Sequence, residues 1–381
     1  MTRGSIYFRL SGFYFWYFAF VGAYGPYFAL YLQDRGFEPF RIAVLMAVGP
    51  VARIFVPNLW GWLADRYRSR DRIQRTLAFI TPFIAAGLLL HPGFIGLLGL
   101  LIAWSLFWSG LLPLVEAGTM TLLRARMGVY GRIRLWGSIG FIAVVVAGGY
   151  LFDAVGVGVL EVVIVVLLVL TSLTVFALPR DRSRPGRQES GSIGAVLRQP
   201  GVIGMIAGFF LMQVAHAPYN TFYSIYLVEA GYSKMSIGWL WALGVIAEIV
   251  LFVWLPRLMR RWRLEQILVA CFCFAIVRFL LIAWGVGSVT ILVVAQLMHA
   301  MTFGAFHAAG VAATHRVFGG ELQSRGQALY SSLGYGAGGA IGTLAAGYAW
   351  ESLGGALTFS LSALAALIAL VMVRNSLPRF Q

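Results

Sequence analysis

Twelve long apolar stretches, separated by short breaks at charged residues, proline and glycine, make up almost the whole chain. They run near residues 7–32, 39–63, 73–90, 94–123, 135–152, 157–178, 202–228, 236–255, 264–283, 289–314, 327–350 and 356–373. An α-helix needs about 20 predominantly apolar residues to cross the hydrocarbon core of a bilayer. The pattern therefore predicts an all-α membrane protein with twelve transmembrane helices.

The composition supports this interpretation and excludes a water-soluble protein. Hydrophobic residues make up 60% of the 381 and charged residues 11%, whereas soluble domains have about half and about a quarter. So little polar surface cannot cover a compact body in water, and lipid has to cover the rest. Twelve spans also leave no room for a sizeable soluble domain.

The formal net charge of +15 raises the alternative of nucleic-acid binding, but the positions of the charges argue against it. Of the 29 basic residues, Arg35, Arg41 and Lys234 lie in one set of loops, and Arg53 and Arg278 lie within spans. The other 24 lie in the alternate loops and near the two ends of the chain. Basic residues collect on the cytoplasmic side of membrane proteins. We therefore expect a bacterial inner-membrane protein with both termini in the cytoplasm and no nucleic-acid partner.

A polar linker and an internal repeat divide the chain into two halves. Residues 179–200 carry five arginines and separate two domains of six spans each, 1–178 and 201–381. A shift of 195 positions places Tyr31 on Tyr226, Leu32 on Leu227, Gly36 on Gly231, Ile42 on Ile237, Leu45 on Leu240, Ala47 on Ala242, Gly49 on Gly244 and Ala52 on Ala247. Arg53 and Glu248 come next in the two halves and occupy equivalent positions. Duplicated scaffolds hold substrate between their halves, so the repeat predicts two pseudosymmetric six-helix bundles with these charges near a central cavity.

The loop between the second and third spans carries a motif. Gly61 is followed by Asp65, Arg66 and two further arginines at alternate positions. This arrangement resembles the signature of the major facilitator superfamily, in which the acid and arginines latch neighbouring helix ends on the cytoplasmic side. The resemblance implies the major facilitator fold and a conformational latch at Gly61, Asp65 and Arg66. The alternative is a loop that is merely basic.

Further motifs narrow the resemblance. Glu116 and Arg134, on the fourth and fifth spans, are similar to the acid and arginine with which the lactose permease and its relatives hold sugar hydroxyls. Segments that are similar to motifs of 3-phenylpropionate permease-like transporters lie at 131–138, 215–219, 240–248 and 298–303. The resemblance covers nearly the whole chain and implies a secondary active transporter, not an enzyme, which uses a proton gradient and no cofactor.

Charged residues within the spans are the candidate binding and coupling groups. Arg53, Glu116, Glu248 and Arg278 lie inside spans, and Arg134 lies near the inner end of one. Burial of a charged side chain at mid-bilayer costs about 2.5–3.5 kcal/mol even on the insertion scale that gives the lower values. Such side chains should therefore face a cavity and pair with opposite charges. Locked pairs that only join helices are the alternative. Three arginines against two glutamates leave one positive charge, which an anionic substrate can neutralise.

The tenth span places His299, Thr302 and His307 on one polar stripe. In the lactose permease pattern, the position three after the histidine is the protonating carboxylate, and here it is Thr302. Glu248 is then the expected proton carrier beside Arg278, with His299 as its rival and His307 as a further candidate. The choice between Glu248 and His299 stays open.

Polar and aromatic stripes on two other spans are expected to line the cavity. Gln213, His216, Asn220 and Tyr223 recur at offsets of 3, 7 and 10 on the seventh span, and Tyr24 belongs to an aromatic stripe of the first. In the major facilitator superfamily these two spans line the cavity, which implies that these side chains bind substrate. Aromatic faces with a few polar groups suit an amphipathic solute that contains a ring. Ordinary helix packing is the alternative for any single aromatic residue.

Catalytic and metal-binding patterns are not evident. Gly334, Gly336 and Gly339 match a dinucleotide-binding spacing, but they lie within a span, where close helix packing explains them. The five histidines lack metal-site spacing. We expect no catalytic residues and no metal site.

These observations together predict proton-coupled uptake of a small aromatic monocarboxylate, such as a phenylpropionate-like acid, by alternating access. The protein is expected to work as a monomer in the lipid bilayer, with the substrate and protons as its partners. The alternatives are a sugar or nucleoside symporter, a drug exporter, and a membrane sensor that does not transport. Gly140–Phe141 stands where exporters of this superfamily usually have a Gly-Pro pair, which argues weakly against export.

Overall fold

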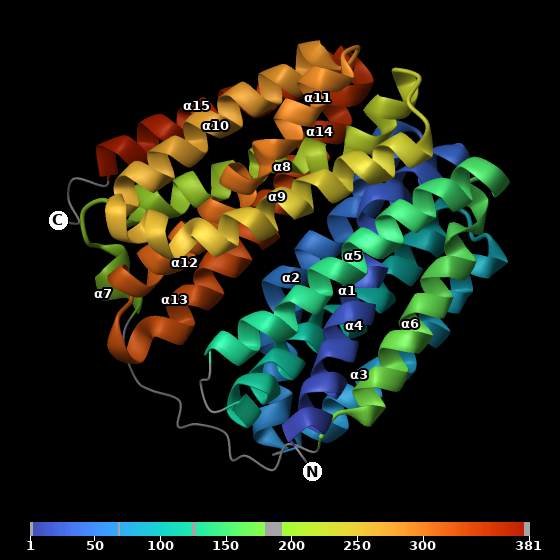
Figure 1. Ribbon diagram of the computed structural model, residues 1–381, viewed down its shortest axis with the longest axis horizontal. Helices are drawn as coiled ribbons and strands as arrows, with labels where there is room; N and C mark the ends of the chain where they lie inside the picture. Colours follow the sequence, from blue (N-terminus) through green and yellow to red (C-terminus); the bar gives the residue numbers. More distant parts are fainter. Residues whose placement is uncertain (1–2, 68, 124–126, 180–192, 377–381) are drawn as a thin grey trace. The chain divides into compact units, whose positions relative to one another are not determined.

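The protein is helical throughout the residues that the structure, a computed structural model, describes: 3–67, 69–123, 127–179 and 193–376. Figure 1 shows the helices, coloured along the sequence from blue to red. The first half contains α1 (Arg3–Asp34), α2 (Pro39–Arg66), α3 (Arg70–Ala85), the 3-10 turn η1 (Ala86–Leu90), α4 (Phe94–Leu123), α5 (Met127–Val155), the 3-10 turn η2 (Val157–Val159) and α6 (Leu160–Ala177). Most of the expected linker, residues 180–192, lies outside the described residues.

The second half begins with a short helix that the sequence did not predict. Its elements are α7 (Ile193–Leu197), α8 (Val202–Glu229), α9 (Lys234–Arg261), α10 (Leu264–Gly285), α11 (Val289–Leu297), the π-helical η3 (Ala300–Ala305), α12 (Phe306–Val317), the 3-10 turn η4 (Gly320–Leu322), α13 (Gln323–Leu329), the π-helical η5 (Tyr330–Gly338), α14 (Gly339–Leu353) and α15 (Gly355–Ser376). Helices α11 and α12 continue each other through η3, and α13 and α14 through η5.

The predicted all-helical membrane protein is confirmed. Ten helical segments among the described residues are long and apolar enough to cross a bilayer. Helix α1, with 32 residues, and the continuous run of α13, η5 and α14 complete twelve segments in the described chain. Many of their large apolar side chains are exposed, as expected where lipid is the solvent.

The internal repeat is visible in how α1 and α8 end. Gly36 has φ +79° and Gly231 has φ +88°, a backbone conformation that favours glycine. The N–H of Gly36 donates to the carbonyl of Gln33, and the next N–H reaches back to Leu32. Gly231 makes the same two bonds one repeat later, to Val228 and Leu227. Both helices therefore end in the same glycine cap, which explains this matched glycine pair.

The described chain forms two compact units, each built mainly from one half of the sequence and a short segment of the other. Unit 1 comprises Met1–Phe37, Phe55–Gly186 and Ser233–Ala242, and unit 2 comprises Glu38–Ile54, Arg187–Tyr232 and Leu243–Gln381. The first part of α2 thus belongs to unit 2, and the first part of α9 belongs to unit 1. Arg53 consequently lies in the same unit as Glu248, its equivalent in the repeat.

Glycine allows α1 and α5 of unit 1 to pack closely. A Cβ at Gly22 would lie 2.7 Å from the carbonyl oxygen of Phe141, and one at Gly140 would overlap the carbonyl oxygen of Phe15. Small residues at such crossings let two helix backbones approach. This contact fixes α5, the helix that carries Arg134.

In unit 2, α8 is the most enclosed span. Some 61% of its most apolar window is buried, more than in any other candidate span of the described residues. It packs against α14, α15 and η5, and a Cβ at Gly342 would lie 2.7 Å from the Cβ of Ala217. Gln213 and His216 of α8 therefore lie inside unit 2.

Candidate functional site

Glu116 of α4 and Arg134 of α5 form an ion pair in unit 1. Arg134 Nη1 lies 3.4 Å from Glu116 Oε1, and both side chains are about one third exposed. The Tyr130 hydroxyl donates to the same carboxylate oxygen, also at 3.4 Å. The guanidinium carbon lies 4.8 Å from the Phe18 ring centroid and 5.2 Å from that of Tyr14. Arg134 thus has a carboxylate partner within the protein and is held over aromatic faces.

The aromatic stripe of α1 is mostly packed core. Tyr17 stacks on Trp108 of α4 with ring centroids 4.3 Å apart and an interplanar angle of 6°. Phe20 and Phe28 of the stripe are also buried. Tyr24 stacks on Phe28 at 4.5 Å and remains partly exposed. Packing therefore explains most of this stripe, and Tyr24 is the member that remains partly exposed.

Glu248 and His299 form a short hydrogen-bonded pair in unit 2. Glu248 Oε1 lies 2.8 Å from His299 Nε2, and the two side chains are 14% and 9% exposed. The His299 ring stacks on Phe303 at 5.3 Å and lies 5.4 Å from the Tyr219 ring. The two candidate proton carriers therefore share one hydrogen bond.

Arg278 of α10 is fully buried and forms no ion pair with a carboxylate in the described parts of the chain. Its Nε donates to the carbonyl of Ala295 at 3.0 Å, and Nη1 donates to Thr302 Oγ1 at 3.2 Å. Nη2 is buried without a hydrogen-bond partner among these residues. The Tyr219 ring centroid lies 4.1 Å from the guanidinium carbon. Because Arg278 is covered, it does not line an open cavity in this structure, contrary to the expectation for membrane-embedded charges.

Gln296 of α11 joins this group, which we call the polar cluster: Glu248, Arg278, Gln296, His299 and Thr302. The Tyr219 hydroxyl donates to Gln296 Oε1 at 3.1 Å, while Gln296 Nε2 and His299 Nδ1 are buried without a hydrogen-bond partner among the described residues. Buried polar groups are nearly always hydrogen-bonded. The unpaired groups therefore make the polar cluster the strongest candidate site for a polar ligand in unit 2.

The predicted polar stripe of α8 divides into buried and exposed members. His216, Gln213 and Tyr223 are buried, and Asn220 is exposed. His216 Nδ1 lies 2.8 Å from the carbonyl of Met212, so this nitrogen is the donor and Nε2 faces the interior without a hydrogen-bond partner among the described residues. Sequence reasoning passed over Tyr219, although it closes the 215–219 motif.

His307 belongs to a second polar group in unit 2. Its Nδ1 lies 2.9 Å from the Tyr335 hydroxyl and 3.5 Å from that of Tyr330. The guanidinium carbon of Arg53 lies 6.0 Å from the Tyr335 ring centroid. Arg53 and His307 are exposed. The structure thus links Arg53 to His307 through Tyr335, which the sequence did not single out.

The predicted latch residues lie at and near the end of α2. Gly61 is half-buried, and Asp65 and Arg66 are exposed. The ion pair that the structure describes in this region is formed by Asp71 and Arg75 of α3, at 3.2 Å. The assignment of Gly61, Asp65 and Arg66 to a latch stays a prediction.

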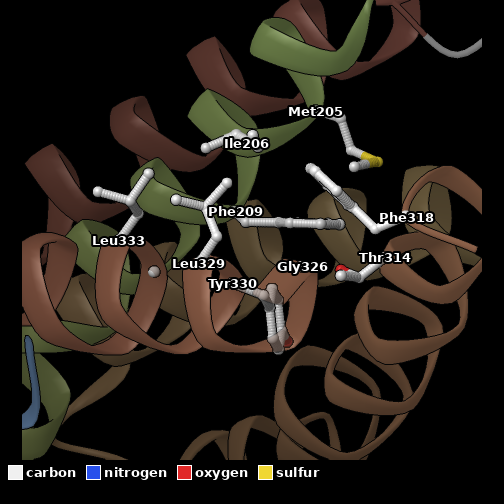
Figure 2. Close-up of a pocket in the computed structure, with 10 residues that line it drawn as sticks. Met205, Ile206, Phe209, Thr314, Phe318, Gly326, Leu329, Tyr330 and Leu333 are labelled. Carbon is white, nitrogen blue, oxygen red and sulfur yellow. The ribbon is translucent and has the colours of Figure 1, made fainter. Parts of the chain in front are cut away.

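A small gap in unit 2 lies apart from these charges. Figure 2 shows Met205, Ile206 and Phe209 of α8 around it, with Thr314, Phe318, Gly326, Leu329, Tyr330 and Leu333. Phe209 and Tyr330 meet edge to face at 5.1 Å. This lining contains no ionisable group other than Tyr330, so it offers no partner for a charged ligand.

Comparison with known proteins identifies the class. The family model described as MFS_1 like family matches residues 7–361. The chain belongs to this family and is a multi-pass membrane transporter of the major facilitator type, with a small-molecule substrate.

Individual relatives narrow the comparison. The chain is 30% identical over 377 residues to the probable 3-phenylpropionic acid transporter of Escherichia coli (strain K12), covering 96% of both chains. It is 25% identical over 347 residues to the maltose permease of Geobacillus stearothermophilus, covering 89% of this chain and 86% of that one. The crystal structure of the nucleoside transporter NupG has the same fold, with a TM-score of 0.80 at 17% identity, covering 97% of this chain and 98% of that one.

Proposed function

We propose that this transporter takes up a small aromatic monocarboxylate together with a proton. The observation that carries the proposal is the hydrogen-bonded pair of Glu248 and His299 beside Arg278, which has no carboxylate partner among the described residues. A carboxylate–imidazole pair can take up one proton, and a buried guanidinium without a directly bonded carboxylate attracts an anion. The similarity to a probable 3-phenylpropionic acid transporter supports the same substrate class.

The proton couples to transport through its effect on the carrier's two orientations. A carrier with a charge buried at mid-membrane turns round at a high energetic cost. A proton on the Glu248–His299 pair and a carboxylate near Arg278 together leave the loaded site with the same net charge as the empty one. The loaded and the empty carrier can then both reorient, which is the condition for tight symport.

The arrangement in the membrane follows from the charge distribution. We place the protein in a bacterial inner membrane as a monomer, with both termini in the cytoplasm. The 24 basic residues on one side of the predicted topology support this orientation.

A sugar or nucleoside symporter is the second candidate, because Glu116 and Arg134 form an ion pair of the type that the lactose permease pattern uses for hydroxyls. The similarity to a maltose permease supports this alternative. Competition separates the two. Inhibition of 3-phenylpropionate uptake by other aromatic acids and not by neutral sugars or nucleosides favours the first candidate, and the converse selects the second.

Medium alkalinisation tests the proposed symport. Adding 3-phenylpropionate to de-energised cells that express the transporter should make a lightly buffered medium more alkaline, because each anion carries a proton inward. Cells that express Glu248→Gln at equal membrane abundance provide the matched control, since passive entry of the protonated acid is the same in both. Equal pH changes in the two strains would reject proton coupling through Glu248.

A further inference from the structure

The geometry points to a coupled site for the proton and the substrate anion in unit 2. A proton on the Glu248–His299 pair turns His299 Nδ1 into a hydrogen-bond donor. Nδ1, Arg278 and Gln296 then together form the site for the substrate carboxylate. This inference rests on the proposed function and adds the residues that hold the anion and the order in which proton and substrate bind. It selects Arg278 over Arg134 and Arg53 as the receiving arginine.

The first step concerns the hydrogen between Glu248 and His299. Their Oε1 and Nε2 atoms are 2.8 Å apart, so one of the two carries the hydrogen of this bond. An ionised carboxylate only accepts. The hydrogen then sits on Nε2, and a neutral imidazole has none left for Nδ1. Without the extra proton, Nδ1 is therefore a bare acceptor.

One added proton changes Nδ1 in either of two ways. If the proton stays on Glu248, the carboxylic acid donates to Nε2 and the imidazole hydrogen moves to Nδ1. If the proton goes to His299, the imidazolium carries a hydrogen on both nitrogens. Nδ1 becomes a donor in both cases. The consequence is therefore independent of which residue formally holds the proton, as expected for two coupled groups.

The second step concerns the groups that surround Nδ1. Nδ1 of His299, Nη2 of Arg278 and Nε2 of Gln296 are all buried without a hydrogen-bond partner among the described residues. The three side chains pack around Tyr219, whose ring lies 4.1 Å from the guanidinium carbon and 5.4 Å from the His299 ring and whose hydroxyl bonds Gln296. The protonated pair therefore adds a third donor to two that already lack acceptors. A carboxylate, which accepts up to four hydrogen bonds, matches this set.

Other charged and titratable groups near the pair do not supply the missing acceptor. Glu248 interacts electrostatically with Arg278 of α10, His307 of α12 and Tyr335 of η5. Tyr219 and His216 of α8 face His299 and Arg278. The His216 Nε2 lone pair and the tyrosine hydroxyls carry no negative charge at neutral pH. Glu248 is the one carboxylate among these neighbours, and its Oε1 is engaged by His299.

The third step concerns the other two arginines. Arg134 already has Glu116 at 3.4 Å, and Arg53 is exposed and lies over Tyr335. Thr302 holds Nη1 of Arg278 with a hydroxyl, so no charge is neutralised there. The substrate carboxylate takes the role of the missing acid. Tyr219 covers the guanidinium and has to swing aside to admit it, and the π-helical η3, which carries Thr302, is the type of segment that often marks functional positions.

Binding measurements on purified protein test the coupling. The probe is 3-phenylpropionate, titrated between pH 5.5 and 8.5 in buffers of different ionisation enthalpy. Wild type should bind more weakly as pH rises and take up about one proton per bound anion, with a coupling in the usual range of roughly 5- to 150-fold. Glu248→Gln should bind with the same affinity at every pH and without proton uptake, because its uncharged amide can donate to His299 Nε2, which leaves the neutral imidazole with its hydrogen on Nδ1. Retained pH dependence with proton uptake in Glu248→Gln would overturn the inference.

A charge added beside Arg278 tests the anion site. In Thr302→Glu, the new carboxylate should occupy Arg278 from within the protein and abolish binding of 3-phenylpropionate. Thr302→Gln, which has the same size as Thr302→Glu and no charge, reproduces the change in packing alone, and it should bind 3-phenylpropionate more tightly than Thr302→Glu does. Thermal unfolding in detergent checks that both variants fold. If Thr302→Glu does not fold, the pH titration of Glu248→Gln tests the inference.

The outcomes separate the inference from the proposed function. Wild type that binds the carboxylate while Thr302→Glu binds it equally well overturns the assignment of Arg278 and leaves the proposed symport intact. Wild type that ignores aromatic carboxylates and binds a neutral sugar or nucleoside overturns both. Loss of binding in Thr302→Glu but not in Thr302→Gln, together with pH-independent binding in Glu248→Gln, supports the coupled site for the proton and the substrate anion.

Discussion

Gly244 leaves the space in which the side chains of Gln296 and His299 lie. A Cβ at this position would come within 3.2 Å of His299 Cδ2 and 3.3 Å of Gln296 Oε1, which is closer than side chains normally pack. Its repeat partner Gly49 has no neighbouring atom within 4 Å of the same position. The same repeated glycine thus has a packing role in one half and none in the other.

Gly244→Ala should therefore impair uptake, because the added methyl group presses on His299 and Gln296. Overpacking of this kind typically costs about 1–3 kcal/mol, and a loss of 1.4 kcal/mol in substrate binding is about a tenfold rise in the apparent Kd. Gly49→Ala is the matched control and should retain wild-type uptake. Uptake that falls equally in both variants, or in neither, would contradict this role of Gly244.

At the residue scale, the sequence identified the charged groups but not the partners of those in unit 2. Rarity of charge inside apolar spans was enough to select Glu248 and Arg278, and the polar stripe of the tenth span selected His299. The carboxylate was expected to lie beside Arg278, and the structure pairs it with His299 at 2.8 Å. Gln296 belongs to the polar cluster and Tyr219 packs against it, and neither has a charge that stands out in an apolar span. Pairing across α8, α9, α10 and α11 depends on tertiary packing, which local sequence does not encode.

At the scale of elements, the start of α9 is held by a helix that lies far away in the sequence. The backbone N–H groups of Lys234 and Met235 both donate to the carboxylate of Asp153 on α5, at 2.8 Å each. A Cβ at Gly149 or Gly238 would lie 2.6 Å from backbone oxygens of the other helix, so α5 and this end of α9 approach closely. Asp153 thus adds, from another helix, to the local cap in which Ser233 Oγ accepts from the N–H of Ser236.

Asp153→Ala should lower stability by about 1 kcal/mol, the usual cost of removing a cap, because two N–H groups lose their acceptor. Asp153→Asn retains an acceptor oxygen and should lose less. Thermal unfolding in detergent measures both. Glu351→Gln offers a comparison, since Glu351 accepts a single longer bond, 3.3 Å from the N–H of Phe40 at the start of α2. Unfolding of Asp153→Ala at the wild-type temperature would contradict the proposed capping.

The spans were predictable as elements, but their internal irregularities were not. Apolar length and breaks at charged residues, proline and glycine are local signals, so ranges such as 264–283 lie close to the observed α10 (Leu264–Gly285). The π-helical η3 and η5 lie inside two spans, where no charged residue or proline marks them. A π-helical turn inserts one extra residue into the helix, and its position depends on how the neighbouring helices pack.

At the scale of the whole molecule, duplication accounts for the architecture. The matched caps at Gly36 and Gly231 show that the repeat extends to backbone conformation. The repeat also puts Arg53 and Glu248 at equivalent positions, but they have different surroundings in unit 2. Because each unit includes a short helical segment of the opposite half, a division of the sequence at the linker could not predict the units completely.

The central claim is that one proton, held by Glu248 and His299, travels with one substrate anion. Such a cycle moves no net charge, whereas moving one elementary charge through a membrane potential of 100 mV involves about 2.3 kcal/mol. A symporter of neutral sugar with one proton moves one positive charge. The response of uptake to the membrane potential therefore distinguishes symport of an anion and a proton from symport of a neutral sugar and a proton.

The most direct measurement is accumulation of labelled 3-phenylpropionate in proteoliposomes under an imposed pH gradient or an imposed potassium diffusion potential. Glu248→Gln vesicles report passive entry of the protonated acid. An alkaline interior should drive accumulation above that control, and an interior-negative potential alone should not. Accumulation driven by the potential, or gradient-driven uptake equal to that of Glu248→Gln vesicles, would contradict the account.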